Sequence, residues 1–251
     1  MHPSMCDEQG DWLGRQALRE WFATALGTSL QIAEIDRLRA ILPQLYGAVA
    51  VQIGCIGSHD WLAGCAIPTR VLYDVAAAPA APAVRGIPEA LPFASKTINL
   101  AVLPHTLDFA LDPHQVLREV DRVLTPEGHV VIVGFNPLSL WGLWRVFDLR
   151  RGRVPWCGHF LRLMRVKDWL ALLDFEIVNG SMLWYRPPLQ RERSMERLRF
   201  LEAMGDRWWP LAAAVYVVVA KKRELGLTPL RPAWRRRLVG RRVTQPLAKS
   251  G

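Results

Sequence analysis

Several common sequence signals are missing from this chain of 251 residues. Its four cysteines form no CxxC pair and have no histidine at ligand spacing, which argues against a bound metal and against a disulfide framework. The first residues lack the pattern of a signal peptide. The longest late apolar run, 210–220, is shorter than the roughly 20 residues of a membrane-spanning helix. We therefore expect a cytoplasmic protein with reduced thiols and no transmembrane segment.

An excess of charge is also missing from most of the chain. Of 32 basic and 23 acidic residues, ten basic residues and one acidic residue follow Ala220, so the preceding part carries 22 of each. The net charge of +9 thus belongs to the tail, 221–251. We predict a flexible tail that either contacts RNA or an anionic surface, with Trp234 available to stack on a base, or only keeps the protein soluble.

The rest of the chain shows alternating helical and strand patterns. Apolar residues recur at helical spacing over 11–26 and 32–45, which predicts two N-terminal helices. Short aliphatic runs without polar alternation follow at 47–54, 69–74 and 97–104. Strands buried on both faces have this composition, so the sequence predicts a parallel sheet covered by helices.

A strand, a helix and a strand follow one another closely in the middle of the chain. The helix starts at Asp112, a favourable N-cap, with Pro113 in its first turn, and a buried strand follows at 129–135. This order predicts a right-handed βαβ unit. Near the end, runs at 175–185 and 213–222 flank a charged helical insert, and they predict an antiparallel pair at the sheet edge.

One stretch, Ala90 to Pro137, resembles the central block of class I S-adenosylmethionine-dependent methyltransferases of the type 11 group. The matching positions are Leu91, Pro92, Phe93, Asp112, Pro113, Leu117, Glu119, Arg122, Val123, Leu124, Pro126 and Gly128. The segments "GFNPLSLWGLWR" and "LMRVKDWLALLDFEIV" look like the narrower group of YafS-type bacterial proteins. This resemblance covers roughly 48–222.

The resemblance implies a fold and a domain division. The expected fold is an α/β, Rossmann-like sandwich whose seven strands have the order 3-2-1-4-5-7-6, with strand 7 antiparallel. We assign 1–46 to an N-terminal helical extension, 47–220 to the methyltransferase-like domain and 221–251 to the basic tail.

The same resemblance implies S-adenosylmethionine as cofactor. The residues expected to bind it are Gln52, Gly54, Cys55, Gly57, Asp74, Glu89, Leu91, Pro104 and His105. Asp74 ends a strand twenty residues after Gly54, which is the spacing of a carboxylate that accepts from both ribose hydroxyls. The other reading of Asp74 is a surface residue that ends a strand.

The glycine turn after the first strand departs from the family pattern. Gln52 replaces the usual acid, and Ile56 replaces the middle glycine, which places a branched side chain where the amino-acid end of the cofactor would lie. Ile87 stands where the family often has an aspartate for the adenine, so Glu89 or a carbonyl near Ala90 is the expected substitute. A short helix is expected between the first two strands.

Catalytic candidates follow the fourth and fifth strands, whose carboxyl ends face the ligand in such sheets. His105 is the predicted general base, with Asp108 to orient it, although a packing role for His105 beside the cofactor is as probable. Asn136, Pro137 and Ser139 follow the fifth strand. Four tryptophans line either a substrate mouth or the core: Trp141, Trp144, Trp156 and Trp169.

Two functions from different classes remain open on the sequence. The first is a methyltransferase of unknown acceptor, with a small molecule as one candidate. The second is an inactive protein of the same fold that binds RNA or a protein through its basic tail. Gln52 and Ile56 favour the second function, whereas Asp74 and the intact block 91–128 favour the first.

Overall fold

The computed structural model describes residues 11–57, 60–75, 83–148, 154–188, 207, 209 and 212–223. They form a seven-stranded sheet with the strand order β3-β2-β1-β4-β5-β7-β6. The strands are β1 (Val49–Ile53), β2 (Thr69–Asp74), β3 (Ala83–Arg85), β4 (Ile98–Pro104), β5 (Leu124–Phe135), β6 (Phe175–Leu183) and β7 (Val215–Lys222). The predicted order is therefore confirmed.

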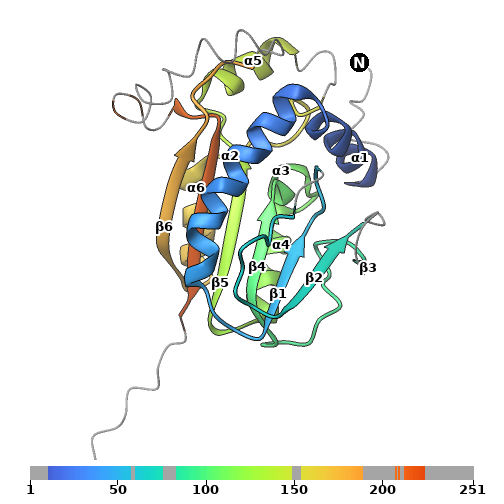
Figure 1. The fold of residues 1–251 in the computed structure, drawn as a ribbon, viewed down its shortest axis with the longest axis vertical. Helices are drawn as coiled ribbons and strands as arrows, with labels where there is room; N and C mark the ends of the chain where they lie inside the picture. Colours follow the sequence, from blue (N-terminus) through green and yellow to red (C-terminus); the bar gives the residue numbers. More distant parts are fainter. Residues whose placement is uncertain are drawn as a thin grey trace, which may run out of the picture.

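Strand directions follow the expectation as well. β1 pairs in parallel with β2 and β4, β2 with β3, and β4 with β5. β7 runs antiparallel to both β5 and β6, so the edge pair that the sequence predicts is present. The five parallel strands end at the upper side of the sheet in Figure 1.

Helices α1 (Asp11–Phe22) and α2 (Ala25–Ile41) cover one face of the sheet, and a short 3-10 helix, η1 (Leu42–Gln44), leads from them into β1. α2 crosses in front of the sheet, and α1 lies above the carboxyl ends of β1, β2 and β4 (Figure 1). Leu18, Leu30 and Leu38 of these helices share one hydrophobic cluster with Ala50 and Val102 of the sheet. The N-terminal helices thus complete the core of the domain.

Helices α4 (Pro113–Val123) and α6 (Leu163–Leu172) cover the opposite face. Their buried side chains, such as Val116, Val120 and Val166, share the second hydrophobic cluster with Val51 and Leu103. Asp112 caps α4, as predicted, because its side chain accepts hydrogen bonds from the amides of residues 114 and 115. Two short helices, α3 (Thr106–Phe109) and α5 (Leu140–Asp148), follow β4 and β5.

Two helix predictions were wrong. The first N-terminal helix ends at Phe22 rather than Leu26, because Thr24 caps a new helix through its side chain and the amide of Gly27. The short helix expected between β1 and β2 is replaced by turns over 61–64. Asp60 shapes the first of these turns by accepting a hydrogen bond from the amide of Leu62, at 2.8 Å.

The predicted tryptophan cluster is only partly correct. Trp141 and Trp156 lie in the same cluster as α1 and α2, with ring centroids 5.5 Å apart. Trp169 packs on the opposite face of the sheet, and Trp144 is 49% exposed. Four tryptophans therefore do not surround one opening.

Some predictions fall on residues that the structure does not describe. The charged insert lies largely outside the described residues, and so does the basic tail beyond Arg223. In the described part of the chain, no helix combines the length and apolarity needed to cross a bilayer.

Candidate functional site

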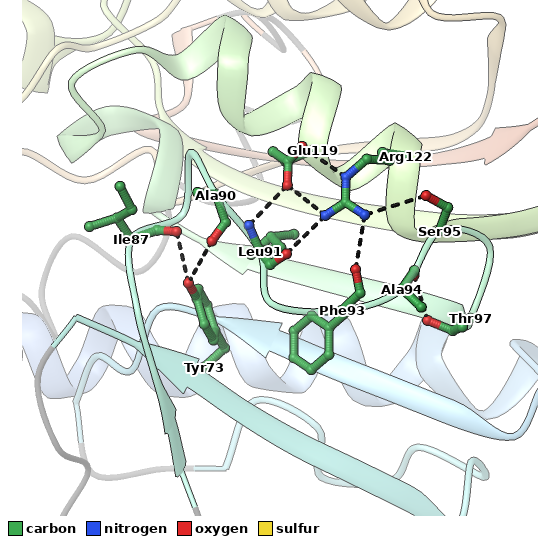
Figure 2. A network of polar contacts seen from close by, with 10 residues as sticks. All are labelled: Tyr73, Ile87, Ala90, Leu91, Phe93, Ala94, Ser95, Thr97, Glu119 and Arg122. Atoms are coloured by element: carbon green, nitrogen blue, oxygen red, sulfur yellow. Dashed lines mark hydrogen bonds and ion pairs between the residues drawn. The ribbon is translucent and has the colours of Figure 1, made fainter.

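Helix α4 holds the loop 87–97, which leads from β3 to β4, by a charged pair (Figure 2). Glu119 accepts a hydrogen bond from the Leu91 amide at 2.9 Å, and Arg122 donates to the carbonyls of Leu91 and Phe93 at 2.8 and 2.9 Å. Arg122 also forms an ion pair with Glu119 at 2.7 Å. The Arg122 guanidinium lowers the pKa of Glu119, so this carboxylate stays charged and accepts strongly.

Tyr73, the residue before Asp74 on β2, holds the other end of the same loop. Its hydroxyl donates to the carbonyls of Ile87 and Ala90, at 2.8 and 3.2 Å (Figure 2). The predicted binding residue Leu91 therefore uses its backbone to fix the loop, while the loop itself borders the end of β2. Glu89 also has partners: it accepts from the amides of Leu111 and Asp112, ahead of α4.

The turn after β1 contains the remnant of the glycine motif. Gly54 and Gly57 have φ angles of +95° and +66°, a conformation that favours glycine. The Ile56 side chain does not project into a cofactor space; it is 3% exposed and belongs to the cluster beneath α1 and α2. A Cβ on Gly57 would meet the Gln31 side chain of α2, whose amide donates to the Ile56 carbonyl at 3.0 Å.

Asp74 lies at the end of β2, beside this turn. It accepts from the Cys55 amide at 3.0 Å and from the Val75 amide at 2.7 Å. Arg19 of α1 completes the arrangement: its guanidinium forms an ion pair with Asp74 Oδ2, and its Nε donates to the Cys55 carbonyl at 2.6 Å. The Asp74 side chain is 1% exposed.

Gln52 occupies the position of the usual acid at the end of β1. Its Nε2 donates to the Gly54 carbonyl at 2.9 Å, which holds the side chain against the turn. Its Oε1 is buried and has no hydrogen-bond partner among the described residues. A buried acceptor of this kind costs free energy until a donor reaches it.

A second polar cluster lies below α2, where β4 ends. His105 follows β4 with a left-handed φ of 49°, after Pro104, and is buried. Its Nδ1 lies 3.0 Å from Asp108 Oδ2, and its Nε2 lies 3.0 Å from Glu34 Oε1 of α2. The predicted contact between His105 and Asp108 is confirmed, whereas the contact with Glu34 was not expected.

Burial and charge set the protonation of this cluster. Burial alone would lower the pKa of His105, but the neighbouring carboxylates of Glu34 and Asp108 outweigh it and raise that pKa to about 9. Burial raises the pKa of both Glu34 and Asp108. Because the three groups titrate together, the cluster holds more protons in the folded protein than in the unfolded chain.

The cluster leaves no unengaged nitrogen on His105 in this structure. A general base needs a nitrogen within reach of the proton it removes, so Glu34 would have to leave His105 first. The general-base role therefore stays a prediction, with this condition attached.

The polar side chains that follow β5 form hydrogen bonds with backbone groups of the chain. Asn136 donates to the Ala213 carbonyl at 2.9 Å and accepts from the Leu138 amide at 3.0 Å. The Ser139 hydroxyl accepts from the Gly142 amide at 3.1 Å, at the start of α5. These side chains fix the path of the chain from β5 into α5.

Three residues of the site were missed in the sequence: Arg19, Gln31 and Glu34. All three lie on the N-terminal helices and look like ordinary polar helix residues. A signal for two of them was present, because Gln31 and Glu34 fall on the stripe of α2 that carries Leu30, Ile35 and Leu38. Polar residues on an apolar stripe indicate buried partners.

The residues at the ends of β1 and β2 fit S-adenosylmethionine. Asp74 offers a carboxylate to a diol, and the unpartnered Gln52 Oε1 offers an acceptor to an ammonium group. The glycine turn lies between them. The fit requires that Arg19 give up its ion pair with Asp74, because a diol needs two of the about four acceptor positions of this carboxylate and Arg19 and two backbone amides already use three.

Comparison with known proteins agrees with the observed fold. The family described as "Methyltransferase domain" matches residues 67–132. The uncharacterized protein YafS of Escherichia coli (strain K12) is 33% identical over 185 residues, which cover 74% of this chain and 72% of YafS.

Two solved structures have the same fold. A SAM-dependent methyltransferase from Thermotoga maritima has a TM-score of 0.56 at 15% identity, over 84% of this chain and 93% of that chain. The [4+2]-cyclase SpnF has a TM-score of 0.58 at 14% identity, over 85% and 96% of the two chains.

The strand order, the antiparallel β7 and the matched domain define the fold of class I, S-adenosylmethionine-dependent methyltransferases. Within that class, the chain belongs to the YafS-like group.

Proposed function

We propose that this protein binds S-adenosylmethionine across the ends of β1 and β2 and transfers its methyl group to an acceptor that enters above β4 and β5. The observation that carries the proposal is the position of Asp74. This carboxylate is buried at the carboxyl end of β2, beside a turn with two left-handed glycines. Ligands bind at this edge of open α/β sheets.

Each residue has a distinct task in the proposed site. Asp74 accepts from the two ribose hydroxyls, and Gln52 Oε1 accepts from the ammonium group. The loop held by Glu119 and Arg122 borders the adenine side, where Ile87 is half exposed. When bound, S-adenosylmethionine supplies a methyl group on a sulfonium, which is a good leaving group.

The chain contributes positioning to the transfer. In an in-line displacement, the bond from carbon to the acceptor forms as the bond from carbon to sulfur breaks, so alignment supplies much of the rate. An acceptor that carries a proton must also lose it. If His105 takes that proton, Glu34 has to release the ring; otherwise the proton goes to solvent.

Calorimetric titration with S-adenosylhomocysteine tests the proposal. We expect the wild-type protein to bind, and Asp74→Ala to bind about 100-fold more weakly, because two charge-assisted hydrogen bonds are lost. Asp36→Ala removes an exposed carboxylate from α2 and is the matched control, with no expected change.

The outcomes separate the two functions. Binding that Asp74→Ala leaves intact would place the cofactor elsewhere. No binding by the folded wild-type protein at millimolar ligand would reject the methyltransferase function and favour a protein that binds RNA or a protein partner through its tail.

A further inference from the structure

Arg19 occupies the place where the proposed cofactor must bind. It lies in the last turn of α1, and its guanidinium contacts both the Asp74 carboxylate and the Cys55 carbonyl. Leu18 and Phe22, on either side, are each 1% exposed, so this turn of α1 is fixed by packing. The Arg19 side chain itself is 22% exposed, so solvent reaches part of it.

A diol and this guanidinium compete for the acceptor positions of one carboxylate. Asp74 Oδ2 already accepts from the Cys55 amide and from Arg19, while Oδ1 accepts from the Val75 amide. A carboxylate offers about four acceptor positions, and a diol that donates twice needs two of them, so ribose hydroxyls that bind Asp74 displace the guanidinium rather than a backbone amide. Removing one partner from a buried ion pair is costly unless the released charge finds another anion.

The contacts of Arg19 indicate where its guanidinium lies after it leaves Asp74. The bond from Arg19 Nε to the Cys55 carbonyl does not involve Asp74, so it holds the guanidinium beside the turn after β1. Gln52, at the end of the same strand, is neutral and places no carboxylate there. The turn consequently favours a ligand group of negative charge.

We propose that Arg19 is a specificity-determining residue: it leaves Asp74 when the ribose diol arrives and then binds the carboxylate at the amino-acid end of the same ligand. This inference rests on the proposed function, since it assumes a nucleoside at Asp74. One ligand that carries both groups replaces both partners of the ion pair. A nucleoside without the carboxylate breaks the same ion pair, offers the guanidinium no anion in exchange and binds more weakly.

Two probes that differ only in the carboxylate test the exchange. S-adenosylhomocysteine carries it, and S-adenosyl-3-thiopropylamine lacks it but keeps the diol, the thioether and the amine. In calorimetric titrations of the full chain, we expect the wild-type protein to bind the first at least ten times more tightly. Equal affinities would overturn the proposal.

The substitution Arg19→Ala should change the affinities for the two probes in opposite directions. We expect the affinity for S-adenosylhomocysteine to fall about tenfold or more, and that for the thiopropylamine to rise, because Asp74 loses its competitor. Equal gains for both ligands would show that Arg19 only obstructs the site, and unchanged affinities would show that it turns away into solvent. Either result overturns the proposed role of Arg19 but does not contradict the proposed cofactor site at Asp74.

Two further variants protect the test against misfolding. Arg19→Lys keeps the charge and should retain a preference for the carboxylate ligand of several-fold, whereas a merely structural arginine would give no such preference. Arg39→Ala removes an exposed arginine of α2 that pairs with Asp36, and it should leave both affinities unchanged. If no variant and no wild-type protein binds either probe, the proposed function fails together with the exchange.

Discussion

The two halves of the candidate site are held in different ways. The loop 87–97 is fixed by Tyr73, Glu119 and Arg122, which all lie within the segment 67–132 that matches the methyltransferase domain family. The turn after β1 and the end of β4 are held by Asp74 and Asp108 of the same segment. They are held in addition by three residues of the N-terminal helices, Arg19, Gln31 and Glu34.

This difference distinguishes two sources of contacts in the site. One is the segment 67–132, here called the family block, and the other is the pair of N-terminal helices. The side chains described above that hold the loop all come from the block itself. The turn that departs from the family pattern, with Gln52 and Ile56, is the part that the N-terminal helices support. Changes in the glycine motif are thus matched by side chains from outside the block.

The largest effect should come from the helix side of this comparison. Glu34→Ala leaves the buried His105 without one of its two partners, and we expect the free energy of unfolding to fall by about 3 kcal/mol. Urea denaturation measures it. Asp36→Ala, an exposed change on the same helix, should alter stability by less than about 0.5 kcal/mol. A loss below about 1 kcal/mol for Glu34→Ala would mean that apolar packing alone holds α2.

A smaller effect is expected from the family block. Arg122→Ala removes the bonds to the Leu91 and Phe93 carbonyls, but the side chain is 37% exposed, so water replaces part of what is lost. We expect a cost of about 1–2 kcal/mol. Hydrogen exchange at the Leu91 amide should also become faster.

The control for this change is Arg118→Ala, an exposed arginine on the same helix. It should leave both stability and exchange at Leu91 unchanged. If Arg122→Ala costs more than Glu34→Ala, the comparison between the two halves is reversed.

The smallest effect is a dependence of stability on pH. The pKa of His105 is raised from 6.5 to about 9 in the folded protein, so its contribution is complete below pH 6.5 and is lost as the pH rises through 9. The raised pKa values of Glu34 and Asp108 act in the same direction. We expect the melting temperature to drop by about 5 °C between pH 6.5 and 9.5.

Glu34→Gln sharpens this prediction. It removes a charge that raises the pKa of His105 and keeps a group of the same size, so the drop should be smaller than in the wild-type protein. An equal drop in both proteins would assign the pH dependence to other groups.

The strands and α4 could be predicted because their signals are local. Continuous aliphatic runs mark β1, β4 and β5, and Asp112 and Pro113 mark the start of α4. The break between α1 and α2 was predicted too late in the sequence, after Leu26, because a helical apolar pattern continues past Thr24, and only the cap shows where the chain turns.

The contacts that the N-terminal helices make with the site could not be predicted from local sequence signals. Arg19 and Asp74 are 55 residues apart, and Glu34 and His105 are 71 apart. Nothing in the spacing of such residues reports that the fold brings them together. Gln52 was recognised as a departure from the family, but the side chains that hold the turn beside it, Arg19 and Gln31, come from distant parts of the chain.

The position of β7 has a consequence for how the chain assembles. Among the described residues β7 is the last strand in sequence, yet it lies between β5 and β6 and supplies the pairing of both. Until residues 215–222 have been synthesised, the buried strand β5 has an open edge and β6 has no neighbour in the sheet. During synthesis, the nascent protein therefore exposes an aggregation-prone edge until this late segment has been made.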